Sequence, residues 1–247
     1  MMILKNKNIL VTGAGKGIGE SCVYNIIFNG GFVYALIKNK KDNKKFKKLK
    51  NVKIFNGNVN NKKLILKILS ESKKNNKPIN CVVNNAGVRF RKSFLKISKK
   101  SLTNVFDINF FSIFNIMQIF TNFVIKNNMK GSIVNISSIV GQLGFKDLSG
   151  YASSKGALTA LTKSYAVEMS DKGIRANTVS PGFVKTSFFE DFKKKRKKLY
   201  KWTLSRIPQK RWADPNEVAE LISFILSDKS NYLNGENISI DGGWSNA

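Results

Sequence analysis

The chain has 247 residues, of which 42% are hydrophobic, and it carries two cysteines, no histidine and a formal net charge of +28. The length suits one domain with a full core, two cysteines are too few for a disulfide framework, and the lack of histidine argues against a metal site. The sequence has no run of about 18 uninterrupted apolar residues and no signal-peptide cleavage site, so we expect a cytoplasmic protein without a membrane span.

The charge itself admits two interpretations. A strongly basic surface can bind a polyanion, such as nucleic acid, a membrane surface or an acidic carrier protein. Alternatively, surface positions have drifted toward Lys and Asn, as an AT-rich coding sequence would produce. Lysines occur along the whole chain, with denser runs at 38–50 and 193–201, and this spread favours the compositional interpretation. We therefore expect no nucleic-acid or membrane partner.

Short β-branched runs alternate with longer amphipathic stretches from one end of the chain to the other. The runs predicted as strands are residues 9–12, 32–37, 52–55, 79–84, 132–137, 176–180 and 237–240. The stretches predicted as helices lie near residues 18–29, 61–75, 101–127, 151–172 and 215–227. This alternation predicts an α/β fold: a Rossmann-type, doubly wound parallel β-sheet with helices on both faces, in a single domain over residues 1–247.

Residues 186–211 interrupt the alternation with a helical stretch that mixes aromatic and cationic side chains. The stretch follows the carboxyl end of a predicted strand, where ligand-covering loops lie in such folds. It is interpreted either as a lid over the substrate or as a solvated pair of surface helices.

A glycine-rich motif, TGAGKGIG at 12–19, joins the first predicted strand to the first predicted helix. In that setting Gly13 permits a tight turn, Gly17 lets the backbone approach a pyrophosphate, and Gly19 lets the helix pack on the strand. The helix N-terminus adds unpaired N–H groups and the positive end of the helix dipole. The motif therefore predicts a dinucleotide cofactor.

The second predicted strand indicates which dinucleotide. Proteins that bind NAD usually carry an acid at the end of this strand for the ribose 2′-hydroxyl, but residues 35–40 contain none. Lys16 and Lys38 can instead pair with a 2′-phosphate, so NADP(H) is favoured over NAD(H). The motif NNAG at 84–87 closes the fourth predicted strand and can line the cofactor or form only a turn.

Ser138, Tyr151 and Lys155 form the predicted chemical centre. Ser138 follows the fifth predicted strand, and Tyr151 and Lys155 lie four residues apart, on one face of a helix. Reduction of a ketone leaves an alkoxide that needs a proton, but the pKa of a free tyrosine, about 10, is too high for efficient acid–base catalysis at neutral pH. A neighbouring ammonium lowers that pKa, and Ser138 can donate a hydrogen bond to the carbonyl oxygen.

Together these motifs resemble those of the short-chain dehydrogenase/reductase family, and the resemblance covers essentially the whole chain. Besides the glycine motif, NNAG and the YxxxK pair, it includes Pro181-Gly182, Thr186 and the C-terminal Asp-Gly-Gly at 241–243. The resemblance implies an NAD(P)-dependent oxidoreductase that interconverts a ketone and a secondary alcohol. It also implies a homotetramer, with the helices at 101–127 and 151–172 and the C-terminal segment at the interfaces.

The resemblance also completes the predicted site. It makes Asn109, Ser138, Tyr151 and Lys155 the catalytic set, with Asn109 holding a water that links Lys155 to solvent. Thr186 would touch the nicotinamide carboxamide. The residues expected to bind the cofactor are Gly13, Lys16, Gly17, Ile18, Gly19, Lys38, Asn58, Val59, Asn85, Ala86, Gly87, Tyr151, Lys155, Pro181, Gly182, Val184 and Thr186.

The sequence leaves the substrate open. In length and layout the chain is similar to 3-oxoacyl-acyl-carrier-protein reductases, which implies NADPH-dependent reduction of a 3-oxoacyl thioester in fatty-acid synthesis. Their carrier protein is acidic, and we expect Lys130 and Lys172 near its docking site. However, the segment VRFRK at 88–92 departs from the Ile-Thr-(Arg/Lys)-Asp of those reductases. A sugar, polyol or other small-alcohol dehydrogenase is therefore the alternative, with Arg89 and Arg91 facing either an acidic substrate or solvent.

A non-catalytic binding or regulatory protein on the same fold is the third hypothesis. A degenerate member of the family would be expected to lose the tyrosine or the lysine, and all four catalytic positions are present here. The sequence therefore favours an enzyme.

Overall fold

A seven-stranded parallel sheet organises the computed structural model, which describes residues 2–187 and 189–247. The strands are β1 (Asn8–Thr12), β2 (Phe32–Ile37), β3 (Val52–Asn56), β4 (Cys81–Asn84), β5 (Gly131–Ile136), β6 (Ile174–Pro181) and β7 (Asn237–Ile240). Their order in the sheet is β3-β2-β1-β4-β5-β6-β7, so the direction of winding reverses between β1 and β4. Cofactors bind at the carboxyl side of such a reversal.

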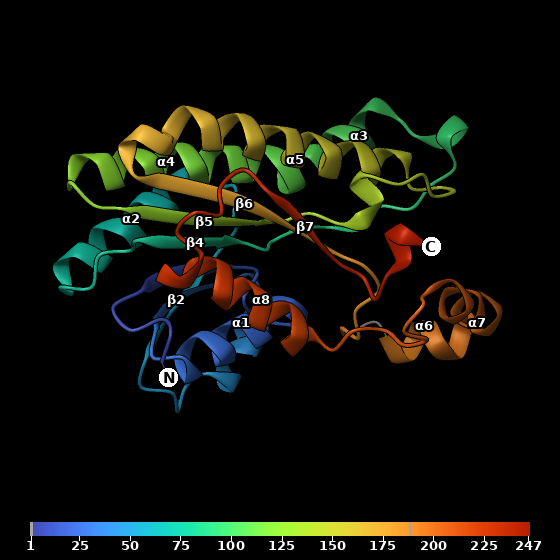
Figure 1. Cartoon of the computed structure of the whole chain (residues 1–247), viewed down its shortest axis with the longest axis horizontal. Helices are drawn as coiled ribbons and strands as arrows, with labels where there is room; N and C mark the ends of the chain where they lie inside the picture. The colour runs from blue at the N-terminus through green and yellow to red at the C-terminus, as the bar shows by residue number, and fades with distance from the viewer. Residues whose placement is uncertain (1, 188) are drawn as a thin grey trace.

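Helices cover both faces of the sheet (Figure 1). On one face lie α1 (Gly17–Phe28) and α8 (Pro215–Leu226), and on the other α2 (Lys62–Lys74), α4 (Ser112–Lys126) and α5 (Ser149–Met169). Successive strand residues feed the two cores: Val11 packs with α1 and α8, whereas Leu10 packs with α2 and α4. The predicted fold class is confirmed.

Several element boundaries differ from the sequence prediction. β4 begins at Cys81 rather than at residue 79, and just before it the Asn80 side chain accepts a hydrogen bond from the Asn8 N–H at 2.9 Å. The helix predicted at 101–127 is α3 (Lys99–Phe106) followed by a π-helical turn at Asp107–Phe111 and then α4. Such a turn places one extra residue in the helix and is common at functional sites.

The joined stretch Lys99–Lys126 is 28 residues long and is the one helical stretch in the described part of the chain that could cross a membrane by length and composition. In the structure its α4 part packs on the sheet through buried side chains that include Ile113, Ile116 and Phe120. Packing in the core therefore accounts for part of the apolar composition of this stretch.

Two short helices, α6 (Phe189–Lys195) and α7 (Lys197–Arg206), lie together beyond the carboxyl ends of the strands (Figure 1). They enclose Trp212, which is 1% exposed and donates a hydrogen bond from Nε1 to Thr203 Oγ1 at 2.8 Å. Phe183, Phe192 and Tyr200 surround its ring at centroid distances of 5.1, 5.1 and 5.7 Å. The two short helices thus pack on the rest of the protein through an aromatic cluster centred on Trp212.

Candidate active site

The carboxyl ends of β4, β5 and β6 meet around a cavity of about 300 Å³. It is lined by Ile18, Asn85, Gly87, Val88, Arg89, Ile136, Ser137, Ser138, Ile139, Val140, Phe145, Leu148, Tyr151, Lys155, Pro181, Gly182, Phe183, Val184 and Thr186. The cavity thus brings together three of the four predicted catalytic residues and most of the residues predicted around the nicotinamide. The predicted residues outside its lining are Gly13, Lys16, Gly17, Gly19, Lys38, Asn58, Val59, Ala86 and Asn109.

Ser138, Tyr151 and Lys155 reach the cavity from two elements. Ser138 follows β5 in an extended conformation, while Tyr151 and Lys155 project from the first turns of α5. The Lys155 ammonium is buried and donates a 2.6 Å hydrogen bond to the carbonyl of Ile136, and it lies 6.0 Å from the centre of the Tyr151 ring. The lysine is therefore fixed to the end of β5 and aligned beside the tyrosine.

Burial controls the protonation of both groups. Desolvation raises the pKa of Tyr151 above its ordinary value, while the charge of Arg89 and a hydrogen bond with the Ser138 side chain act to lower it. Desolvation also lowers the pKa of Lys155 from its ordinary value to about 8. In this structure the Lys155 ammonium donates to the Ile136 carbonyl and lies 6.0 Å from the centre of the Tyr151 ring, and its expected lowering of the pKa of the phenol stays a prediction.

Asn109 lies behind the cavity, in the π-helical turn, and is completely buried. Its Oδ1 accepts from the Val88 N–H at 2.8 Å, and its Nδ2 donates to the Val88 carbonyl at 3.0 Å and to Ser154 Oγ at 3.2 Å. A Cβ on Gly87 would lie 3.3 Å from Asn109 Oδ1 and 3.7 Å from Lys155 Nζ. Asn109 therefore joins the NNAG segment to α5 next to the lysine.

The glycine motif forms a cradle that fits a dinucleotide. Gly17 has a φ of +58°, which favours glycine, and a Cβ there would lie 3.1 Å from the Thr186 methyl group. Asn85 Nδ2 donates to the carbonyls of Thr12 and Gly13 at 3.0 and 3.1 Å. The NNAG motif is thus tied to the glycine loop, and the N–H groups at the start of α1 are the ones that can bind a phosphate.

At Gly19, α1 comes so close to the glycine loop that a Cβ would lie 2.3 Å from the Gly13 carbonyl oxygen. This is the close helix–strand approach that the motif predicts.

The predicted adenosine end of the cradle lies at the carboxyl ends of β2 and β3. Lys16 and Lys38 are exposed there. Asn58 and Val59 follow β3, where Asn58 Oδ1 accepts from the Asn60 N–H at 3.1 Å and Val59 packs against the core.

Sequence reasoning missed Asp42 at this end of the cradle. The turn at Lys40–Lys45 folds back so that a Cβ on Gly15 would lie 2.9 Å from an Asp42 carboxylate oxygen, and Lys45 Nζ donates to the Gly15 carbonyl at 2.9 Å. The available signal was an acid roughly 20 residues beyond the glycine motif. It was overlooked because Asp42 follows the end of β2 by several residues. The sequence also gave no sign that Phe145, Leu148 and Phe183 would wall the cavity.

The sequence matches known proteins along nearly its whole length. The family model described as enoyl-(acyl carrier protein) reductase matches residues 13–245. The 3-oxoacyl-[acyl-carrier-protein] reductase FabG of Staphylococcus epidermidis is 30% identical over 244 residues, covering 96% of this chain and 98% of that protein. FabG of Thermotoga maritima is 41% identical over 139 residues, which are 56% of this chain; the chain thus spans about half of that relative's length, 55%.

Solved structures share the entire fold. A putative gluconate dehydrogenase from Agrobacterium tumefaciens superposes with a TM-score of 0.93 at 25% identity, over 100% of this chain and 98% of that one. 4-Hydroxyisoleucine dehydrogenase complexed with NADH and ElxO with NADP bound each have a TM-score of 0.90 at 28% identity, over 98% of this chain and 99% of theirs. Because the family model spans nearly all of the sequence and these structures share its whole architecture, the chain belongs to the short-chain dehydrogenase/reductase family of oxidoreductases, which act on alcohol and ketone groups.

Proposed function

We propose that this oxidoreductase reduces 3-oxoacyl thioesters with NADPH, as fatty-acid synthesis requires. The observation that carries the proposal is a second cavity of about 230 Å³, which shares Arg89, Phe145, Leu148 and Phe183 with the catalytic cavity. Its remaining lining is Arg91, Lys146, Phe192, Leu199, Trp202 and Thr203. This second cavity is lined largely by apolar side chains and adjoins the catalytic cavity, so it suits an acyl chain. Its cationic lining residues are Arg89, Arg91 and Lys146.

The proposed role of the 186–211 segment follows from this cavity. Phe192 belongs to α6, and Leu199 and Trp202 belong to α7, so both short helices wall the second chamber. Thr186, which precedes α6, lies against Gly17 of the glycine loop. We therefore assign the segment as a lid that covers substrate and cofactor together.

In the proposed reaction the bound nicotinamide would supply the hydride. Ser138 would donate a hydrogen bond to the carbonyl oxygen, and Tyr151 would give that oxygen its proton. Lys155 would hold the nicotinamide ribose and pass a proton to the phenolate, with Asn109 ordering the water that connects Lys155 to solvent. The approach of Asn109 Oδ1 and Lys155 Nζ to the same glycine, Gly87, supports this path.

NADP(H) is the proposed cofactor, because Lys16 and Lys38 are exposed at the predicted adenosine end and can pair with a 2′-phosphate. The Asp42 carboxylate beside Gly15 opposes that preference. Dissociation constants for NADPH and NADH, measured by fluorescence titration, test the assignment. A clear preference for NADH would overturn it.

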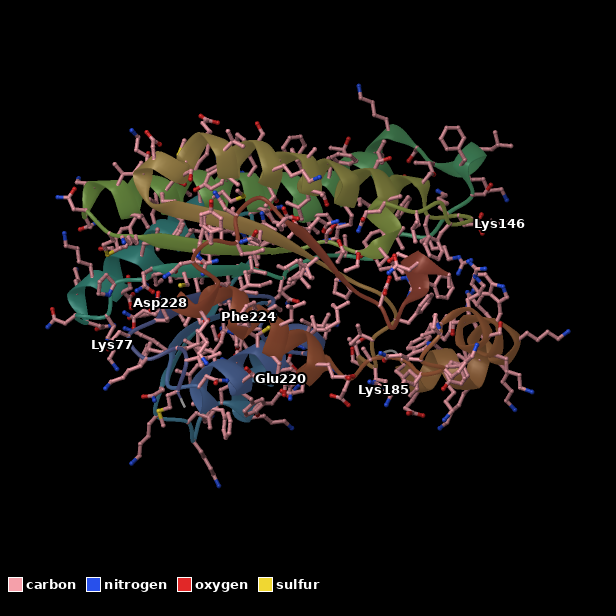
Figure 2. The ribbon with its side chains drawn as sticks, in the orientation of Figure 1. Lys77, Lys146, Lys185, Glu220, Phe224 and Asp228 are labelled. Atoms are coloured by element: carbon pink, nitrogen blue, oxygen red, sulfur yellow. The ribbon has the colours of Figure 1, made fainter. Side chains whose placement is uncertain are left out.

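An acidic acyl carrier protein is the proposed partner. Lys130 and Lys172 precede β5 and β6, so they lie at the amino edge of the sheet, a strand's length from the cavity of the same protomer. Their contact with a carrier therefore stays a prediction. Lys146 and Lys185 lie at the same end of the molecule as the lid (Figure 2) and are better placed to meet a carrier there.

A homotetramer in the cytoplasm is the proposed state of the protein. Helices α4 and α5 carry large apolar side chains on their outer sides, among them Ile125 at 43% and Val167 at 83% exposure. Such side chains suit a subunit interface. Light scattering of the purified protein measures the assembly, and a stable monomer would contradict it.

A second candidate function is oxidation of a small acidic alcohol, such as a sugar acid. The observation that favours it is Arg89, a guanidinium that lines both the catalytic and the second cavity. A guanidinium can bind a carboxylate through two parallel hydrogen bonds.

The deciding experiment is a screen of the purified enzyme that follows NADPH absorbance. Acetoacetyl thioesters are compared with a panel of sugars, polyols and sugar acids, each with Tyr151→Phe as the inactive control. The proposal expects the highest kcat/KM with the thioesters. Turnover confined to sugar acids would replace it with the second candidate, and no turnover on any ketone or alcohol, with a preserved fold, would contradict both.

A further inference from the structure

We propose that a cavity at the amino edge of the sheet, separate from the catalytic cavity, binds the phosphate group of a small molecule. The cavity measures about 420 Å³ and lies between the first residues of β5 and β6 and the turn at Asp228–Ser230 that follows α8. Asp228, one of its lining residues, lies at the end of the molecule away from the lid helices α6 and α7 (Figure 2). Among the described residues, none lines both this cavity and the catalytic one.

One wall of the cavity is a row of side chains that the register of the sheet places side by side. Ser132 on β5 is paired with Cys81 on β4 and with Arg175 on β6. Paired residues point to the same face of a sheet, and Cys81 belongs to the core on the α1 and α8 side. The Arg175 guanidinium therefore extends toward the end of α8, where its Nη2 donates to the Ser227 carbonyl at 2.9 Å.

Two polar atoms of this row are buried and have no hydrogen-bond partner within the part of the chain that the structure describes. They are Ser132 Oγ and Arg175 Nη1, and the Ser132 residue as a whole is only 5% exposed. A buried donor that makes no hydrogen bond costs stability, so a native protein keeps one where a water, an ion or a ligand completes it. A single water takes up about 30 Å³, and this cavity is many times larger.

The charges around the cavity favour an anion as that ligand. The charged residues in its lining are Lys7, Lys130, Arg175 and Asp228, and three cations with one carboxylate leave a net charge of +2. Lys7 Nζ lies 2.6 Å from Asp228 Oδ1, so these two charges offset each other. The unbalanced charges are therefore those of Arg175, in the wall, and of exposed Lys130.

The arrangement of the donors favours a phosphate group over a carboxylate. A guanidinium binds a carboxylate best through two parallel hydrogen bonds, but Arg175 Nη2 is already held by the Ser227 carbonyl. Arg175 Nη1, the Ser132 hydroxyl and the Lys130 ammonium come from three separate points of the lining, which suits the several acceptor oxygens of a phosphate. The volume lies within the range of about 300–1,000 Å³ of small-molecule sites, so the phosphate can belong to a larger molecule.

Isothermal titration calorimetry with inorganic phosphate, at low and constant ionic strength, tests the site. We expect saturable binding that Ser132→Ala and Arg175→Gln each weaken about tenfold or more, because each loses one hydrogen bond to a charged ligand. Malonate, a dicarboxylate, should bind about tenfold more weakly than phosphate. Lys38→Met is the matched control: it removes a cation at the cofactor end and should leave phosphate binding at this cavity unchanged.

Thermal unfolding separates binding from a structural role. Because Ser132 Oγ has no partner among the described residues, Ser132→Ala should raise Tm by about 2–4 °C without phosphate. Added phosphate should raise Tm of the wild-type protein more than that of the variant. The Ser132→Ala comparison stands by itself if Arg175→Gln does not fold.

The proposal would be overturned by the absence of phosphate binding, or by binding that both cavity variants leave intact. Binding lost in Lys38→Met instead would place the phosphate at the cofactor cradle, and malonate binding as tight as phosphate would overturn the choice of a phosphate group. Because the titrations use neither a ketone nor a nicotinamide, their result is independent of the proposed thioester reduction.

Discussion

Gly19→Ala tests whether the cofactor cradle depends on close packing between α1 and the glycine loop. The added methyl group would lie 2.3 Å from the Gly13 carbonyl oxygen and 2.5 Å from Asn85 Nδ2. Overpacking of this kind costs about 1–3 kcal/mol. The methyl group would also displace the Asn85 amide from its two backbone acceptors, at about 1 kcal/mol each.

Alanine offsets part of this loss, because it favours a helix by about 1 kcal/mol over glycine. The expected net effect is a decrease of about 2–4 kcal/mol in the free energy of unfolding. NADPH binding should weaken as well, since Asn85 aligns the NNAG segment with the glycine loop. Urea unfolding and fluorescence titration with NADPH measure the two effects.

Gly144→Ala provides the matched control, because a Cβ at that position meets nothing within 4 Å. It should change the free energy of unfolding by less than about 0.5 kcal/mol, as surface substitutions usually do. If Gly19→Ala behaved like this control in both measurements, the close approach at Gly19 would contribute neither to the free energy of unfolding nor to NADPH binding, and the reasoning would be refuted.

Three further predictions concern the centre of the site and the cofactor. Tyr151→Phe should abolish turnover while NADPH still binds, because only the transferable proton is lost; a near-wild-type rate would refute its role as the acid. Lys155→Met should cut turnover and weaken NADPH binding, yet raise the free energy of unfolding by up to about 3 kcal/mol at pH 7. Its folded pKa of about 8 lies below the unfolded value of about 10.4, so protonating the buried amine costs stability. That gain should shrink from pH 8 to about 10.5 in urea titrations, and a pH-independent difference would contradict it. Lys38→Met should lower affinity for NADPH about tenfold and leave NADH unaffected, and an equal loss for both cofactors would remove Lys38 from the 2′-phosphate site.

The fold could be predicted because its strands are buried on both faces. Such strands read as short apolar runs, and β1 illustrates this: Leu10 and Val11 point to opposite cores and are both fully buried. The π-helical turn at Asp107–Phe111 was not predictable, because one extra residue in a helix hardly changes the apolar periodicity. Yet that turn is what brings Asn109 to Val88.

The position of a residue relative to its strand decides which of the predicted residues meet in the cavity. Residues that end or follow a parallel strand share one edge of the sheet, so Asn85, Ser138 and Pro181 meet in the cavity although far apart in sequence. Lys130 and Lys172 precede their strands, and the same rule places them at the opposite edge. Asp42 was not predicted, because it lies in a turn beyond the end of β2, and this turn brings it next to the glycine loop.

Tyr151 and Lys155 show which features of a site the residue spacing predicts and which it does not. A separation of four residues does put both side chains on one face of α5, as the sequence predicts. The direction of the ammonium is decided by burial instead, because a desolvated ammonium needs an acceptor and finds one in the Ile136 carbonyl. Desolvation lowers the pKa of this ammonium to about 8. Arg89 lines the same cavity, and its charge acts to lower the pKa of the phenol against the effect of burial.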